Sequence, residues 1–140
     1  MRKSPFPPVS PTKSRRLKNE QVRSLLDQHG GDDGTSDRHV VHYLYPHSIN
    51  AKPRWEVAAN LVKLGFFVDI GRGDSGVVAE EIREVASVDF DSLTEAFEQM
   101  ARDNGWVYDG WECEAIHKPQ NEWSMRIPRE ALQIQSIDWK

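Results

Sequence analysis

Three histidines near the middle of the chain are the first residues that could do chemistry, because imidazole serves both as a metal ligand and as a general base near neutral pH. His39, His42 and His47 lie within nine residues of one another. A single zinc ion would need all three imidazoles on the same side. The surrounding residues predict a strand over 38–45, in which His39 and His42 point to opposite faces, and Pro46 turns the chain before His47. We therefore expect no metal centre.

A glycine-rich segment suggests a second kind of chemistry, the binding of a nucleotide phosphate. Gly71, Gly73 and Gly76 have the spacing of the dinucleotide-binding fingerprint, which functions only where the glycines connect a strand to the N-terminus of a helix. Residues 77–88 have β-branched residues at both ends, although a helical stripe also fits them. We predict a strand there, so that the glycines form a hairpin turn. A small-molecule or nucleotide-binding domain that uses the Gly71–Gly76 loop is the alternative, and no cofactor is otherwise expected.

The remaining reactive side chains point to no enzyme. Cys113 is the single cysteine, so the chain cannot form an internal disulfide. It has the same parity as Trp111 on the last expected strand, which favours a packed thiol over a nucleophile. Glu80, Glu81 and Glu84 are expected to form a solvated face. Because no Ser/His/Asp set or pair of carboxylates stands out from the composition, we predict a protein without catalytic activity.

Length and composition favour one domain in the cytoplasm. The 140 residues can form one hydrophobic core, and no apolar run approaches the length of a membrane span. Prolines interrupt the basic N-terminus and no apolar segment follows them, so we expect no secretory signal. Since the chain also has only one cysteine, the cytoplasm is the default location.

The charge is divided unevenly between the N-terminus and the rest of the chain. Residues 1–18 carry six Lys/Arg and no acid, whereas residues 19–140 carry 12 basic and 22 acidic side chains. An acidic body repels phosphate backbones and suits a basic protein partner. The proline spacing predicts a disordered, solvated leader over residues 1–16. RNA binding through this basic arm is a further alternative.

The elements that must position these residues alternate between strands and helices. A short amphipathic helix is expected over 17–28. The elements after it are a strand over 38–45, a helix from Ser48 or Asn50 to Gly65, strands over 66–70 and 77–88, a helix from Asp89 or Asp91 to Gly105, and a strand over 106–112. This βαββαβ order folds most simply as a four-stranded antiparallel sheet with two helices on one face, an α+β class.

Apolar stripes on the two later helices predict the faces that meet the sheet. The stripe of the first comprises Trp55, Ala58, Ala59 and Val62. The stripe of the second comprises Phe90, Leu93, Ala96, Phe97 and Met100.

The densest aromatic stretch of the chain is expected to form the last strand. Alternation along 106–112 predicts one face with Trp106, Tyr108 and Gly110, and an opposite face with Val107, Asp109 and Trp111. Tryptophan and tyrosine dominate both hydrophobic cores and binding hot spots. Burial statistics favour the core for these side chains.

Three motifs resemble the family of the regulator of ribonuclease E activity B (RraB). They are Val41-His42-Tyr43 in the first strand, Lys63-Leu64-Gly65-Phe66-x-Val68 at a helix end and, as the most specific, Tyr108-Asp109-Gly110-Trp111 in the last strand. The resemblance implies a ferredoxin-like fold and a non-catalytic bacterial protein that binds the endoribonuclease and restrains RNA cleavage. The chain departs from the family pattern at Tyr43, where a second histidine is usual. It also has a basic Pro-rich leader, and a Trp-bearing C-terminus where family members often have an acidic tail.

We therefore expect a leader over 1–16, an RraB-like domain over 17–115 and a C-terminal extension over 116–140. The expected function is protein binding, as an inhibitor of ribonuclease E or of a related RNA-processing enzyme, without membrane contact. The residues expected to form a partner-binding or structural motif are His42, Tyr43, Tyr108, Asp109, Gly110 and Trp111.

Overall fold

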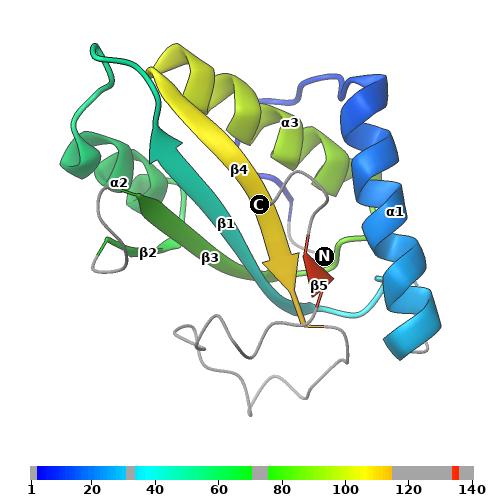
Figure 1. Cartoon of the computed structure of the whole chain (residues 1–140). Coiled ribbons are helices and arrows are strands. Elements are labelled where there is room, and N and C mark those ends of the chain that lie inside the picture. Colours follow the sequence, from blue (N-terminus) through cyan, green and yellow to red (C-terminus); the bar gives the residue numbers. More distant parts are fainter. Residues whose placement is uncertain (1–2, 31–33, 71–75, 115–133, 136–140) are drawn as a thin grey trace.

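One antiparallel sheet forms the centre of the fold (Figure 1). A computed structural model describes residues 3–30, 34–70, 76–114 and 134–135, so the expectations for 71–75 and for most of 116–140 lie outside the described residues. The described elements are α1 (Lys13–Gly30), β1 (Arg38–Pro46), α2 (Arg54–Lys63), β2 (Phe67–Asp69), β3 (Val77–Arg83), α3 (Val88–Asp103), β4 (Trp106–Cys113) and β5 (Ile134–Gln135). The predicted α+β class is confirmed.

The strands follow the spatial order β2-β3-β1-β4-β5, and every neighbouring pair is antiparallel. β1 therefore lies at the centre of the sheet, with β3 on one side and β4 on the other. β5 adds two residues at the end of β4. Because β3 begins at Val77, the segment after Gly76 is a strand and not the helix that the dinucleotide fingerprint requires. The nucleotide-binding alternative loses its structural basis.

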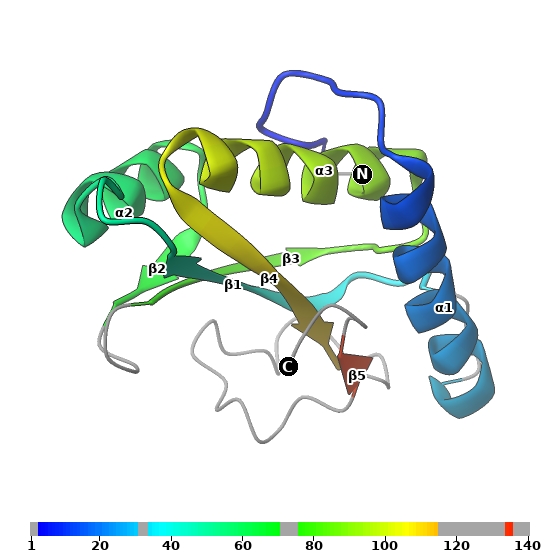
Figure 2. The ribbon, with the colours of Figure 1, turned by 45° about the horizontal axis from the view of Figure 1, so that its top comes forward.

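The helices α2 and α3 cover one face of the sheet, and α1 crosses the end of this layer (Figure 2). The main core lies between the sheet and these helices, and it contains Val40 and Leu44 from β1 together with Phe90 and Phe97 from α3. A smaller cluster of Val41, Tyr43 and Val78 lies on the opposite face of β1 and β3. The alternation predicted for the first strand is thus confirmed.

Helix α2 differs from the prediction in both its start and its buried face. Its first residue is Arg54, directly after Pro53, and no side chain caps it, so Ser48 and Asn50 are not N-caps. Proline fixes φ and lacks an N–H, which makes it a natural boundary here. The buried residues are Val57, Ala58 and Leu61. The predicted stripe was wrong because only Ala58 of its four members faces the core.

Helix α3 follows the prediction closely. Phe90, Leu93, Ala96 and Phe97 are buried, and Met100 packs at the margin of the core. The N-cap, however, is Ser87, whose hydroxyl accepts the backbone N–H of Phe90 at 3.1 Å. Asp89 and Asp91 therefore lie in the first turn, where the helix dipole still favours their negative charge.

A bulge in β4 changes which aromatic side chains share a face. His42 pairs with Trp111 and Leu44 with Tyr108, so Asp109 and Gly110 together oppose the single residue Tyr43. Gly110 has φ +94°, a conformation that glycine adopts without steric cost. The extra residue reverses the alternation, and Tyr108 and Trp111 both enter the main core. The predicted division of this strand between two faces was wrong for this reason.

The N-terminal segment is the largest departure from the prediction. Residues 13–16 belong to α1, which begins at Lys13 rather than Leu17. The backbone N–H groups of Ser4, Val9 and Thr12 donate hydrogen bonds to side chains of α3. The predicted disorder was thus wrong for residues 3–16, because the proline pattern concealed a segment whose backbone is bound by another element.

Gly110→Ala is expected to lower the free energy of unfolding by about 1–2 kcal/mol, because an L side chain is strained at positive φ. Gly110→Asn should cost less, since asparagine tolerates this region better than alanine. Urea unfolding followed by circular dichroism measures both values. If alanine were tolerated as well as asparagine, the positive φ of Gly110 would not hold the bulge.

Candidate functional site

A chain of buried hydrogen bonds links three strands beneath α3. The Tyr108 hydroxyl of β4 lies 2.8 Å from His42 Nδ1 of β1, and His42 Nε2 lies 2.6 Å from Glu81 Oε2 of β3. Arg83 Nε donates to Glu81 Oε1 at 2.6 Å. All four side chains are at most 5% exposed. We call Tyr108, His42, Glu81 and Arg83 the buried polar chain.

One arrangement of protons satisfies every bond in the buried polar chain. The Tyr108 hydroxyl donates to Nδ1, and the Nε2–H of a neutral His42 donates to the Glu81 carboxylate. Arg83 supplies the positive charge that balances Glu81 and also bonds Asp89 at 3.3 Å. The chain therefore carries one buried negative charge, which is paired.

Burial lowers the pKa of the His42 imidazole below its usual value of 6.5, although the hydrogen bond that it donates to Glu81 opposes this shift. Burial alone would raise the pKa of Glu81. The hydrogen bond from His42 and the charge of Arg83 outweigh that effect, so that the pKa of this carboxyl is lowered. Near neutral pH, His42 is neutral and Glu81 is ionised.

Aromatic rings enclose the His42 imidazole on several sides. Phe97 stacks on it with ring centroids 4.3 Å apart, and Phe66 and Phe90 approach within 6.0 and 6.3 Å. His42 is 0% exposed, so no substrate could reach its ring nitrogens, both of which already have partners. The buried polar chain thus holds the strands together and offers no free acid or base.

A second group of polar bonds fastens α1 to the sheet and to α3. The indole N–H of Trp111 donates to Asn19 Oδ1 at 3.0 Å, and Asn19 Nδ2 donates to Asp91 and Thr94. Arg23 bonds the same Asp91 carboxylate. Trp111 thus connects β4 to α1 through a hydrogen bond as well as through packing.

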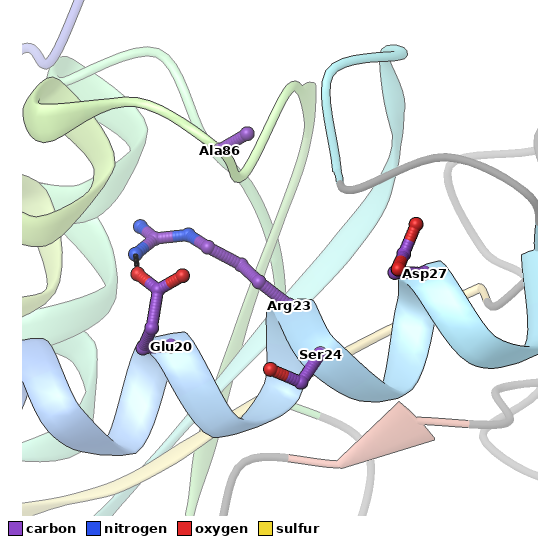
Figure 3. Close-up of a pocket in the computed structure, with 5 residues that line it drawn as sticks. All are labelled: Glu20, Arg23, Ser24, Asp27 and Ala86. Carbon is purple, nitrogen blue, oxygen red and sulfur yellow. Dashed lines mark hydrogen bonds and ion pairs between the residues drawn. The ribbon is translucent and has the colours of Figure 1, made fainter.

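A polar pocket of about 340 Å³ lies between α1 and the loop after β3 (Figure 3). Its wall is formed by Glu20, Arg23, Ser24, Asp27 and Ala86. Arg23 does not offer its guanidinium to a ligand, because it bonds Glu20, Asp91 and the carbonyl oxygens of Val85 and Ser87. The pocket is therefore a polar gap between α1 and the loop after β3, and its arginine is used to join the two elements.

A larger hollow, of about 430 Å³, adjoins the Tyr108 ring. Its charged residues already interact, since Glu98 pairs with Arg15 at 2.9 Å and with Arg102 at 3.8 Å. The Trp106 indole N–H donates to the carbonyl oxygen of Lys52. The charged groups and the Trp106 indole of this hollow are thus already engaged within the protein.

The clearest exposed apolar surface lies on α2. Trp55, Ala59 and Val62 recur at helical spacing on the side of α2 that faces solvent, and Trp55 and Val62 are 67% and 57% exposed. We call these three residues the α2 face. Exposed tryptophan is unusual on a surface that meets only water and is frequent at protein interfaces.

The structure brings together three of the six predicted motif residues. His42, Tyr108 and Trp111 meet in the core, whereas Tyr43 lies in the smaller cluster with Val41. Asp109 and Gly110 form the bulge. Five of the six residues are buried, and Asp109 is half-buried. Their role in the described structure is to hold the fold.

Sequence reasoning missed Glu81 and Arg83 and placed Glu81 on a solvated face. Glu81 and Glu80 are buried instead, and Glu80 bonds His39 at 2.9 Å on the other parity of β3. The alternation of β3 could have revealed them, because Glu81 and Arg83 lie on the same face of the strand as Val77 and Ala79. No group of three possible metal ligands occurs among the described residues.

Acidification below about pH 6.5 is expected to lower the free energy of unfolding. Unfolded His42 takes up a proton near 6.5, whereas folded His42 has a lowered pKa and stays neutral, so added protons favour the unfolded state. The slope contributed by His42 can reach about 1.4 kcal/mol per pH unit. Glu81 adds a further loss below its usual value of 4.5, because its stabilising charge disappears as the pH falls through its lowered pKa.

Urea unfolding between pH 7.5 and 4 measures this dependence. His42→Gln should flatten the slope between pH 6.5 and 5.5, and His47→Gln should leave it unchanged because His47 is exposed. An equal slope in wild type and in His42→Gln would show that His42 is not the titrating group.

Tyr108→Phe is expected to destabilise the protein by about 1–3 kcal/mol, because it leaves His42 Nδ1 buried without its hydroxyl donor. Tyr45→Phe is the matched control, since Tyr45 is 36% exposed and belongs to the same sheet. Thermal unfolding of both variants gives the comparison. An equal effect of the two changes would remove the buried polar chain as a source of stability.

Comparison with known proteins adds no relative to these observations. No protein-family model matches the chain, and no curated protein matches its sequence. Among the described residues, no helix is long and apolar enough to cross a membrane. The resemblance to the RraB family therefore depends on the three sequence motifs alone.

Proposed function

We propose that this chain is a non-catalytic, protein-binding regulator that acts in the cytoplasm as an RraB-like inhibitor of ribonuclease E or of a related RNA-processing enzyme. The observation that carries the proposal is a contrast between interior and surface. Among the described residues, His42 and Glu81 are buried and paired, while an indole and two aliphatic side chains are presented to solvent on the α2 face. Such a distribution suits binding better than catalysis.

The arrangement of the strands supports a ferredoxin-like assignment for the domain. Starting from β4, the four main strands run in the order β4-β1-β3-β2, with α2 and α3 on one face. The βαββαβ succession and this order agree with a split βαβ topology. Fold alone does not define function, so the partner must be argued from the surface.

The α2 face and the charge of the chain together describe the partner. Trp55 would act as the anchor that enters an apolar pocket, with Ala59 and Val62 excluding water around it. Residues 19–140 carry 12 basic and 22 acidic side chains, which favours approach to a basic protein segment.

The RNA-binding alternative has less support. Arg15 of the basic arm is 2% exposed and paired with Glu98. The backbone N–H groups of Ser4 and Thr12 are bound by acidic side chains of α3, which would repel a phosphate backbone.

Trp55→Ser is expected to reduce retention of ribonuclease E by at least about tenfold in a pull-down with purified proteins, because truncation of a central tryptophan removes a binding hot spot. Leu17→Ser is the matched control, since Leu17 is also exposed, at 58%, but lies on α1. Thermal unfolding should show both variants folded, because neither residue belongs to the core. A parallel cleavage assay should show inhibition by wild type and by Leu17→Ser.

Failure of wild type to retain ribonuclease E would discard this partner. Recovery of another protein from lysate, lost in Trp55→Ser but kept in Leu17→Ser, would retain the binding role and change its target. Equal recovery by all three proteins would remove the α2 face from the interface.

A further inference from the structure

The N-terminal segment of residues 3–12 is held along α3 by a ladder of backbone hydrogen bonds. The Ser4 N–H donates to Asp89 Oδ2 at 2.7 Å, and the Val9 N–H donates to Ser92 Oγ at 3.1 Å. The Thr12 N–H donates to Glu95 Oε1 at 3.0 Å. The three acceptors are spaced by three residues and therefore share one side of α3. The chain bends within this segment, because Phe6 contacts Phe97, which lies beyond Glu95 on α3.

Phe6 anchors the segment between two core rings. Its centroid lies 5.1 Å from that of Phe97, in an edge-to-face arrangement, and 6.2 Å from that of Phe66. Phe6 is half-buried and packs against the main core. Phe6 thus packs the segment against the core, and three backbone N–H groups bond side chains of α3.

The composition of the segment suits this mode of attachment. Pro5, Pro7, Pro8 and Pro11 have no N–H, so the donors that α3 uses come from the other residues of the segment, which lie before, between and after the prolines. Prolines also fix φ, which lowers the entropy lost when an extended segment is bound. These three bonds involve backbone groups, and the Thr12 hydroxyl adds one side-chain hydrogen bond to Glu95 Oε1 at 3.1 Å.

We propose that this side of α3 is a docking groove for proline-rich segments with one aromatic anchor, and that residues 3–12 occupy it in the free protein. The groove comprises Asp89, Ser92 and Glu95 with the rings of Phe66 and Phe97. The inference rests on the proposed protein-binding function and names the partner's segment: a basic, proline-rich stretch that displaces residues 3–12.

Charge complementarity favours a basic segment as the occupant. The groove presents the carboxylates of Glu95 and of Asp89, which Arg83 also bonds at 3.3 Å, and Glu98 lies one turn further along α3. Glu98 already pairs with Arg15, three residues beyond the segment, so the basic character of the chain's own N-terminus continues along the same side of the helix. The tethered segment competes at an effective concentration on the order of millimolar. A partner must therefore bind more tightly or through a second contact such as the α2 face.

The test uses the full chain and a blocked peptide with the sequence of residues 3–12. The protein is ¹⁵N-labelled and studied as wild type, as Phe6→Ala and as Val9→Pro, which removes the N–H that Ser92 accepts and leaves the core unchanged. We expect both variants to bind the peptide at least about tenfold more tightly than wild type, with amide shifts at Ser92, Glu95 and Phe97. The same peptide with alanine in place of its phenylalanine should bind at least about tenfold more weakly.

Equal affinity for wild type and both variants, absence of binding, or shifts confined to other elements would overturn the groove. Trp55→Ser in the full chain should bind the peptide as wild type does. If Trp55→Ser lost ribonuclease E but peptide binding followed the expected pattern, the two proposals would stand together. If wild type failed to retain ribonuclease E while the peptide bound as expected, only the partner would be discarded.

Discussion

The ionised carboxylate of Glu81 is the constraint on which the rest of the described fold depends. A carboxylate without solvent costs several kcal/mol unless charged and hydrogen-bonding partners compensate it. Arg83 and His42 provide that compensation from β3 and β1, and Tyr108 extends the chain to β4. The order of the strands brings these groups together, since β1 lies between β3 and β4. A slip of one residue between β1 and β3 would turn Glu81 to the other face and separate it from His42.

The same requirement explains why the bulge and the first helix belong to one arrangement. The bulge turns Tyr108 and Trp111 inward together, so that one completes the hydrogen bonds of His42 and the other reaches Asn19 on α1. α1 is in turn fixed by Arg23 and Asp91. The polar groups of the interior therefore fix the register of the strands and the orientation of α1.

The sequence allowed the order of the elements to be predicted, because hydrophobic periodicity reports local structure directly. The stripe of α3 was predicted correctly, since Phe90, Leu93 and Phe97 are strongly apolar and recur at helical spacing, although Asp91, Thr94 and Glu95 are buried beside them. On α2, Trp55 and Val62 were assigned to the core because they are apolar, although Leu61 and Val57 fill it. Glu81 was assigned to solvent because a charge is rarely buried without partners, and its partners are distant in sequence. A glycine in a strand can mark a bulge, but the bulge is recognised only when the pairing of that strand with its neighbour is known. The bulge at Gly110 could therefore not be predicted from the sequence.

The position of Cys113 has a practical consequence for following motion in this molecule. It is the only thiol of the chain, is 0% exposed, and lies at the end of β4, where the strand pairs with β5. A thiol reagent can reach it only when this edge of the sheet separates or the chain unfolds. The rate at which a thiol reagent labels Cys113 therefore reports how often this edge of the sheet opens, and no probe has to be introduced into the protein.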